Sequence, residues 1–323
     1  MASHTDTALL GLPALVVHGG AGAFAAVSCD GDVAVLTAAL EASTAAGWSV
    51  LAAGGSALDA VVEAVASLED SGCFNAGRGA VPTDDGTVEL DASVMDAVTG
   101  RVGALCAATR PANPVRAARA VAELRGVPDG PVLLAGTGAD RFCEEQGLEV
   151  MRPEWLRAHG GAGGVLPLWS ERSREARAPG PVISEEGTVG AVAVDAAAGV
   201  AAATSTGGRT GQRRGRVGDS PIPGAGVLAV PLARGGSVAV SATGAGEAFL
   251  VTGFAHRIAW EIEHGSSLVE ATEHALAVVG HLEGTGGGIA VDATGQMVAS
   301  FTSPAMARAW RGSGAGAAYL FPR

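Results

Sequence analysis

The sequence contains no lysine, because all 21 of its Lys and Arg residues are Arg. Schiff-base catalysis requires a lysine amine, and a P-loop requires a lysine that reaches the phosphates of the nucleotide. The sequence therefore excludes a lysine Schiff-base enzyme and a P-loop nucleotide-binding protein.

Positive charge is scarce in this chain. The formal net charge is −12, and the one basic tract consists of Arg213, Arg214 and Arg216. A protein that binds nucleic acid needs a basic surface that neutralises phosphates. DNA and RNA are therefore not expected as partners.

The four cysteines, Cys29, Cys73, Cys106 and Cys143, are far apart and form no CxxC pair. This spacing favours buried free thiols over a zinc site or a disulfide framework. Residues 1–13 lack the basic start of a signal peptide, and no run of about 18 apolar residues is uninterrupted. We therefore expect no membrane span and a cytoplasmic location.

Glycine is abundant instead. The 49 glycines follow no collagen-like period, which indicates many tight turns and a strand-rich fold with a backbone-lined site. At roughly 150 residues per domain, 323 residues would allow two domains, but a layered sandwich uses this length for one. Length alone leaves both options open.

The first half of the chain mixes strands and helices. Strands are predicted over residues 14–18, 81–83, 87–95 and 101–108, the last three as an antiparallel meander, and helices over 33–53, 56–68 and 114–124. Ser56 and Asp59 form an expected capping box at the start of the second helix.

Residues 149–187 have the Gly-, Arg- and Pro-rich composition of a mobile linker. The second half resumes with strands over 188–195, 200–204, 226–232 and 237–243, helices over 247–263 and 267–279, and strands over 288–292 and 297–301. This order favours an α+β fold of sheets covered by helices over a doubly wound parallel sheet.

The junction between Gly187 and Thr188 follows the linker and opens a strand. If this peptide bond breaks, Thr188 gains an α-amine beside its hydroxyl, and an α-amine with a pKa of about 7.7–8.0 suits a general base. The pattern therefore predicts a self-cleaving amidohydrolase. The alternative is a threonine that merely opens a strand after a glycine turn.

Five sequence blocks, in order, carry a family resemblance. They are HGGAG at 18–22, LEDSGCFNAGRG at 68–79, GTVGAVAVD at 187–195, TSTGG at 204–208 and GRVGDSP at 215–221. Together with TGAGE at 243–247, they make the chain resemble the plant-type L-asparaginase and isoaspartyl peptidase family of N-terminal nucleophile hydrolases. The resemblance implies one domain, 1–323, with a four-layer αββα sandwich, cut into 1–187 and 188–323, and two such αβ units paired in a homodimer.

The resemblance also implies catalytic roles. Thr188 is the nucleophile that attacks the peptide bond after Gly187 and later the substrate. Thr206 hydrogen-bonds near the hydroxyl and amine of Thr188, and Thr243 with Gly244 forms the oxyanion hole. No cofactor is expected for catalysis.

Arg216 and Asp219 carry opposite charges three residues apart, a spacing that suits a clamp on the α-carboxylate and α-ammonium of a small substrate. Gly246 is expected to add a carbonyl to the ammonium site. Such a clamp presents a β-carbonyl for attack, so L-asparagine and β-aspartyl dipeptides are the expected substrates. The alternative is an internal salt bridge.

The resemblance implies a structural sodium ion in the loop after the second helix. Its ligands would be the main-chain carbonyls of six residues: Leu68, Glu69, Ser71, Phe74, Ala76 and Arg78. Asn75 and residues 18–20 would shape the pocket, with His18 a structural rather than an acid–base group.

Some residues depart from the family pattern and leave alternatives open. Glu185 and Glu186 place negative charge beside the cleavage point, Ala245 leaves the leaving-group preference undefined, and Arg78 is unusual in its loop. A related amidase acting on glycosylasparagine or another amide is one alternative. A non-catalytic nucleotide-binding or scaffold protein is another, although no glycine loop matches G-x-G-x-x-G after a strand.

Overall fold

The computed structural model describes residues 3–24, 30–124, 130–151, 187–313 and 316–319. Most of the predicted linker, residues 152–186, lies outside the described residues, as do Glu185, Glu186 and Cys29. The described cysteines, Cys73, Cys106 and Cys143, are buried, as predicted.

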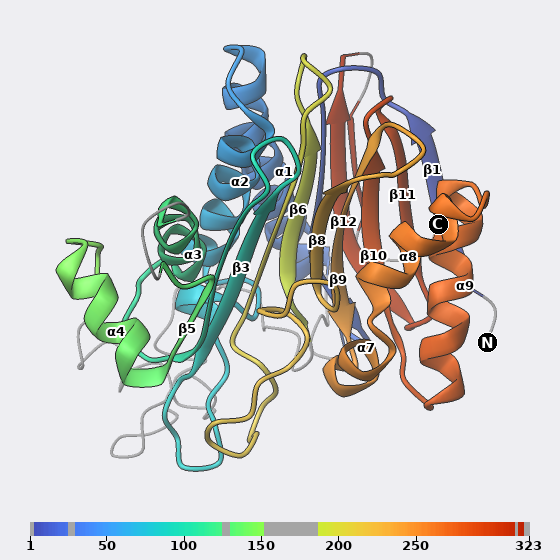
Figure 1. The fold of residues 1–323 in the computed structure, drawn as a ribbon. Coiled ribbons are helices and arrows are strands. Elements are labelled where there is room, and N and C mark those ends of the chain that lie inside the picture. The colour runs from blue at the N-terminus through green and yellow to red at the C-terminus, as the bar shows by residue number, and fades with distance from the viewer. Residues whose placement is uncertain (1–2, 25–29, 125–129, 152–186, 314–315, 320–323) are drawn as a thin grey trace.

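Two β-sheets lie face to face in the middle of the molecule (Figure 1). The larger sheet has the order β13 (Gly316–Tyr319), β12 (Ala305–Gly312), β2 (Ala14–Gly22), β6 (Val189–Val194), β7 (Val200–Thr206), β3 (Leu90–Asp96), β4 (Arg101–Ala108) and β5 (Leu133–Ala135). The smaller has the order β1 (His4–Leu9), β11 (Gln296–Phe301), β10 (Gly286–Asp292), β9 (Ser237–Gly244) and β8 (Val227–Pro231). Every described neighbouring pair is antiparallel except β4 with β5.

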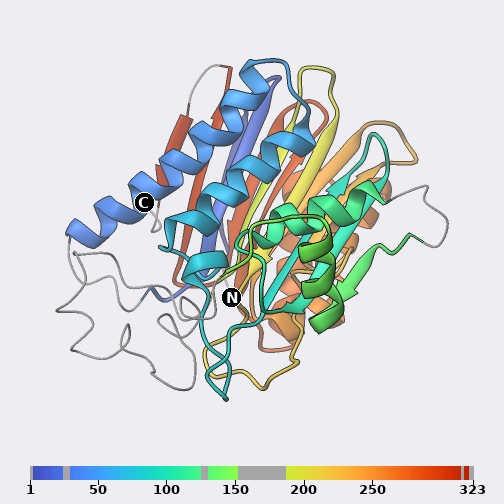
Figure 2. The same cartoon turned by 90° about the vertical axis from the view of Figure 1, so that its left-hand side faces the viewer.

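Helices cover the outer face of each sheet. The larger sheet is covered by α1 (Asp30–Ala52), α2 (Ala57–Ser71), α3 (Pro114–Glu123) and α4 (Gly136–Glu145), which Figure 2 shows lying across it. The smaller sheet is covered by α7 (Gly246–Thr252), α8 (Phe254–Glu263) and α9 (Leu268–His281). A short 3-10 helix, η1 (Gly77–Gly79), follows α2. The predicted four-layer αββα sandwich is confirmed.

The burial of strand β6 explains why the sequences of the central strands are continuous runs of apolar residues. Val189, Ala191 and Ala193 belong to the core beneath the helices, whereas Val192 and Val194 belong to the core between the sheets. Both faces of the strand are buried, so neither calls for polar residues. A register slip of one residue would exchange the two sets of side chains, and this fixes where Thr188 lies at the start of the strand.

Several predicted elements differ from the structure. The predicted strand 81–83 is wrong, because Thr83 makes only an isolated bridge to Gln212. The predicted helix 247–263 is two helices, since Gly253 has a φ of 60° between α7 and α8. Elements not predicted are β1, η1, β5, α4, β12 and β13.

A buried charge accounts for part of this difference. Arg308 interrupts the apolar pattern of β12, yet it is fully buried and forms an ion pair with Asp6 of β1, 2.6 Å from Nη2 to Oδ2.

Ser56 caps α2 by accepting from the Asp59 N–H at 3.1 Å, while its own hydroxyl donates to the Asp59 carboxylate. The complete capping box is at Ser267 and Glu270 of α9.

Helix α1 contains one described segment, Val33–Ala52, that is long and apolar enough by length and composition to cross a membrane. Leu36, Leu40 and Leu51 of this segment are buried in the core that α1 shares with α2 and the larger sheet. We therefore interpret α1 as a helix that covers a sheet.

Candidate active site

Three threonines meet where strands of the two sheets end. Thr188 directly precedes β6, Thr206 ends β7, and Thr243 lies next to the last residue of β9. Strands β6 and β7 are neighbours in the larger sheet, and β9 packs against them from the smaller sheet. The sandwich thus brings together residues that are up to 55 positions apart.

Thr188 is held by hydrogen bonds at both of its functional groups, and only 6% of the residue is exposed. Its backbone N–H donates to Thr243 Oγ1 at 3.1 Å, and its Oγ1 lies 3.2 Å from Ser220 Oγ. The Thr243 hydroxyl also accepts from the Ala21 N–H at 3.2 Å, so its own proton remains available for donation. The nitrogen and the hydroxyl of Thr188 therefore have defined positions.

Thr206 contacts the peptide bond that precedes Thr188. Its hydroxyl donates to the Gly187 carbonyl oxygen at 3.4 Å and accepts from the Gly208 N–H at 3.0 Å. Sequence reasoning placed this hydroxyl near the hydroxyl and amine of Thr188, whereas the structure places it on the adjacent carbonyl. A donor at this carbonyl favours nucleophilic attack on its carbon atom.

Ser220 is a site residue that the sequence analysis missed. It is buried, and its Oγ is a side-chain hydrogen-bond partner of the Thr188 hydroxyl. Its carbonyl in turn accepts from the Ser93 hydroxyl of β3 at 2.6 Å. The sequence feature that could have identified Ser220 is its position between Asp219 and Pro221 in the GRVGDSP block.

Gly20 allows the chain to approach the Gly187–Thr188 junction closely. Its φ is 110°, and a Cβ at this position would lie 3.0 Å from Gly187 Cα. Only glycine fits both the backbone conformation and the space. This gives the HGGAG block a physical role beside the junction.

A buried polar group lies behind the nucleophile. His18 Nε2 and Ser241 Oγ are 2.8 Å apart, and Ser241 Oγ is 2.8 Å from Thr204 Oγ1. Complete burial lowers the pKa of His18 to about 3, so the imidazole is neutral. This agrees with the prediction that His18 is structural.

Replacing Ser241 with Ala should lower the free energy of unfolding by about 1–3 kcal/mol, because buried His18 and Thr204 lose a hydrogen-bonding partner. Chemical denaturation would measure this change in the free energy of unfolding. Ser49→Ala, at an exposed helical serine, is the control and should change stability by less than about 0.5 kcal/mol. Equal stability of Ser241→Ala and Ser49→Ala would contradict the structural role of this group.

Arg216 and Asp219 converge beside Gly246. A Cβ on Gly246 would lie 2.8 Å from Arg216 Nη2 and 2.9 Å from Asp219 Oδ1, so both side chains reach one space. Among the described ion pairs, Arg216 pairs with Glu247, at 2.9 Å, and not with Asp219. The described contacts therefore do not support the alternative of an internal salt bridge between the two.

Asp219 is almost fully buried. Burial raises the pKa of its carboxyl to about 7, with Asp91 and Glu247 adding to the rise and Arg216 opposing it. Its Oδ2 makes no hydrogen bond to any described residue. A buried carboxylate oxygen without a partner is costly unless a cation binds to it.

These groups line a single pocket. Its described lining consists of Gly187, Thr188, Thr206, Gly208, Arg209, Arg216, Asp219, Ser220, Gly244, Ala245 and Gly246. Thr243 lies next to the lining through its bond to Thr188. Arg209 lines the pocket and Glu247 pairs with it, and both side chains are more than half exposed, so they mark the mouth of the pocket. Sequence reasoning assigned neither of them.

The predicted sodium loop lies outside this pocket but is joined to it. Asn75 Nδ2 donates to the Gly208 carbonyl at 2.7 Å, and the Gly207 N–H donates to the Asn75 carbonyl. The Glu69 carboxylate accepts from Ser205 Oγ and from the Val115 N–H. Burial raises the pKa of Glu69 to about 8.

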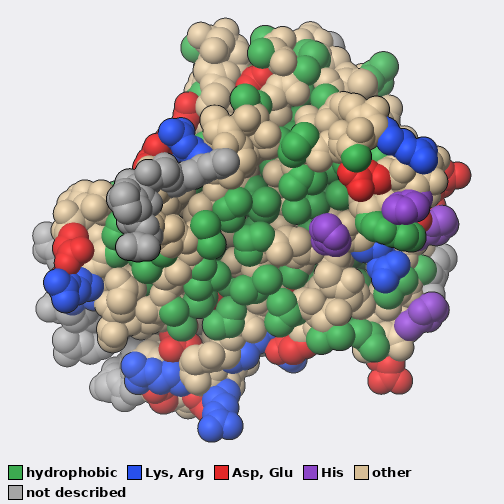
Figure 3. All heavy atoms as spheres, in the orientation of Figure 1, with side chains coloured by type: hydrophobic (Ala, Val, Ile, Leu, Met, Phe, Trp, Pro, Cys, Tyr) green, Lys and Arg blue, Asp and Glu red, His purple; other side chains and the backbone are tan. Residues whose placement is uncertain are grey.

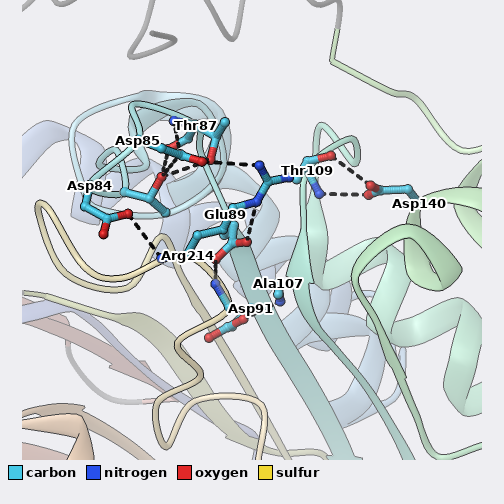
Figure 4. A network of polar contacts seen from close by, with 11 residues as sticks. Asp84, Asp85, Thr87, Glu89, Asp91, Ala107, Thr109, Asp140 and Arg214 are labelled. Atoms are coloured by element: carbon cyan, nitrogen blue, oxygen red, sulfur yellow. Dashed lines mark hydrogen bonds and ion pairs between the residues drawn. The ribbon is translucent and has the colours of Figure 1, made fainter.

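The segment that carries Arg216 is anchored by carboxylates of the segment that precedes β3 (Figure 4). Glu89 accepts from the Gly215 N–H at 2.8 Å, and Asp85 accepts from Arg214 Nη1 at 3.2 Å. The backbone next to Arg216 is therefore fixed before any substrate binds.

Comparisons with known proteins agree with this geometry. A family model described as asparaginase matches residues 11–320. An isoaspartyl peptidase of Salmonella typhimurium is 42% identical over 310 residues, covering 92% of this chain and 94% of the relative. The isoaspartyl peptidase of Escherichia coli is 41% identical over 93% of both chains, and a plant-type L-asparaginase of Pyrobaculum calidifontis is 40% identical over 92% of this chain and 96% of its own. The chain therefore belongs to the asparaginase family of hydrolases that includes the isoaspartyl peptidases and the plant-type L-asparaginases.

Proposed function

We propose that this protein is a self-processing threonine hydrolase that cleaves β-aspartyl dipeptides and the side-chain amide of L-asparagine. The observation that carries the proposal is the convergence of Arg216 and Asp219 beside Gly246, in the pocket that also contains Thr188. A guanidinium and a carboxylate at this spacing match an α-carboxylate and an α-ammonium.

Maturation begins with attack of Thr188 Oγ on the Gly187 carbonyl carbon. Thr206 donates to the oxygen of that carbonyl, and so stabilises negative charge as it develops. The bond between Gly187 and the Thr188 nitrogen breaks, the nitrogen takes up the proton released by the hydroxyl, and an ester to Oγ forms. Water hydrolyses the ester and leaves chains 1–187 and 188–323, the second with a free amine at Thr188.

In the mature enzyme the Thr188 amine takes the proton of its own hydroxyl, and Oγ attacks the β-carbonyl of the substrate. The Thr243 hydroxyl and the Gly244 N–H donate hydrogen bonds to the carbonyl oxygen and stabilise the negative charge that develops on it. The leaving amine takes up a proton as the C–N bond breaks, and water then hydrolyses the aspartyl ester. Gly246 supports the ammonium end of the substrate beside Asp219.

The experiment that tests this function is a comparison of three substrates: β-Asp-Leu, L-asparagine and a glycosylated asparagine. Hydrolysis of the first two supports the proposal. Hydrolysis of the glycosylated asparagine alone would replace it with the related amidase.

Binding at the clamp should depend on pH. Only the ionised carboxylate of Asp219 attracts an ammonium group, and its pKa is raised to about 7. Inhibition by the product L-aspartate should therefore weaken roughly tenfold per pH unit below about pH 7 and level off above it. Measuring the inhibition constant from about pH 5.5 to 9 checks this, and the change should disappear in Asp219→Asn. A flat profile in the wild type would contradict the role of Asp219.

Sodium remains part of the proposal. A Cβ on Gly79 would strike the Phe74 carbonyl oxygen and would lie 3.0 Å from the Gly72 carbonyl oxygen, so backbone carbonyls of this loop converge on one small space. The carbonyls of Leu68, Glu69, Ser71, Phe74, Ala76 and Arg78 would hold it, and oxygen ligands suit a hard cation. The ion would stiffen the loop that Asn75 joins to the pocket.

We also infer that two αβ units form a homodimer in the cytoplasm. In Figure 3 hydrophobic side chains gather across the middle of the visible face, while Arg, Asp and Glu side chains lie mainly at its margins. Such a face suits association with a second copy. Light scattering should give about twice the 31.7 kDa mass of the chain.

A further inference from the structure

The mouth of the pocket carries a second arginine besides Arg216. The Arg216 side chain is 16% exposed and is bonded to Glu247 and Gln212. The Arg209 side chain is 55% exposed, and its Nη1 lies 3.7 Å from Glu247 Oε2. These two residues are the permanent positive charges among the described residues that line the pocket.

The backbone of Arg209 is fixed, although its side chain is exposed. Its N–H donates to Gln212 Oε1 at 2.9 Å, and the preceding Gly208 has a φ of 76° and accepts from Asn75. Arg209 therefore enters the pocket from the Thr206 side of the nucleophile. Its guanidinium lies beside the clamp, because the Glu247 carboxylate pairs with both Arg209 and Arg216.

The contact between Arg209 and Glu247 is weak. Both side chains are more than half exposed, and exposed ion pairs contribute about 0–1 kcal/mol. Glu247 keeps its shorter bond to Arg216 when Arg209 moves away. The Arg209 guanidinium can therefore turn to an anion that enters the mouth at little cost.

The two proposed substrates differ in charge only in the leaving group. The α-carboxylate and α-ammonium of the aspartyl part are common to both, and Arg216 and Asp219 account for them. Asparagine releases ammonia, whereas a β-aspartyl dipeptide releases an amino acid that carries a second carboxylate. With the aspartyl part held at Gly246 and the β-carbonyl at Thr188, this leaving group extends toward the mouth.

We propose that Arg209 selects leaving groups that bear a carboxylate, by pairing its guanidinium with the C-terminal carboxylate of a β-aspartyl dipeptide. This specificity role rests on the proposed function and adds a second anion subsite to the same pocket. It makes the protein a dipeptidase in preference to an asparaginase.

The test compares kcat/KM for β-Asp-Leu, for its C-terminal amide and for L-asparagine in the wild type and in Arg209→Gln. Loss of one charge-assisted pair should lower the ratio of β-Asp-Leu to asparagine by about tenfold. The wild type should prefer the free acid over the amide, and Arg209→Gln should lose that preference. Rates are normalised to the fraction of chain cut at Gly187, measured by mass.

Arg213→Gln is the matched control, because Arg213 is an exposed arginine of the same segment that does not line the described pocket. It should leave all three ratios unchanged. An equal loss for all substrates in Arg209→Gln would overturn the inference, because Arg209 would then serve the common α-carboxylate, and an unchanged ratio would also overturn it. A fully cut wild type that hydrolyses neither asparagine nor β-Asp-Leu would instead refute the proposed function, and the inference with it.

Discussion

Thr188→Ala is expected to remain a single full-length chain and to lose at least about 10⁴-fold in kcat. The substitution removes the hydroxyl that attacks both the Gly187 carbonyl and the substrate. The fold should be retained, because the Thr188 N–H still donates to Thr243 Oγ1. Denaturing gel analysis and steady-state hydrolysis of β-Asp-Leu measure the two losses.

Thr188→Ser is the matched control for this result. It keeps the hydroxyl and loses the methyl group that restricts χ1. It should still cleave itself and hydrolyse substrate, at reduced rates. Hydrolysis by Thr188→Ala at a rate near that of Thr188→Ser would show that another group is the nucleophile.

Arg216→Gln should lower kcat/KM about 100-fold for asparagine and for β-Asp-Leu alike. The α-carboxylate is common to both substrates, and a charge-assisted bidentate pair in a mostly buried site contributes about 1.5–3 kcal/mol. The equal effect on both substrates distinguishes this residue from Arg209. Steady-state kinetics on the two substrates provides the measurement.

Chain cleavage gives the control within the same variant. Arg216 contacts Glu247 and Gln212, and none of the described hydrogen bonds of Gly187 or Thr188 involves it. Arg216→Gln should therefore be cut completely. A fully cut variant with less than about a threefold loss would place the α-carboxylate elsewhere.

The glycine-rich blocks were the most informative part of the sequence. Gly20 and Gly246 mark places where a Cβ would strike the Gly187 backbone or the two clamp side chains. Such positions tolerate few residues, so they carry a recognisable pattern even when the flanking strands are generic alanine and valine. The predicted nucleophile and clamp residues consequently line one pocket.

Side-chain pairing could not be predicted in the same way. Thr206 bonds to the Gly187 carbonyl, Ser220 to the Thr188 hydroxyl, and Glu247 to Arg216. Each pairing depends on how the ends of β6 and β7 and the loops after β7 and β9 approach one another in space. Residue types and spacing along the chain do not determine that approach.

Strand β12 was missed for a related reason. Its central Arg308 looks like an exposed residue in the sequence, and the distant Asp6 on β1 pairs with it in the core. Strands that owe their burial to a long-range ion pair carry a weak local signal. At Gly253 the local pattern was misleading in the opposite direction. The apolar pattern predicts one continuous helix, but this single residue with positive φ ends α7.

The central claim is that Thr188 becomes an N-terminal nucleophile, and intact mass under denaturing conditions tests it most directly. Freshly purified and incubated wild-type protein would be measured beside Thr188→Ala, with β-Asp-Leu hydrolysis followed in the same samples. The account predicts two fragments divided between Gly187 and Thr188 in the wild type alone, with activity rising in proportion to the cut fraction. A persistent full-length chain that hydrolyses the dipeptide, or a cut at another bond, would contradict it.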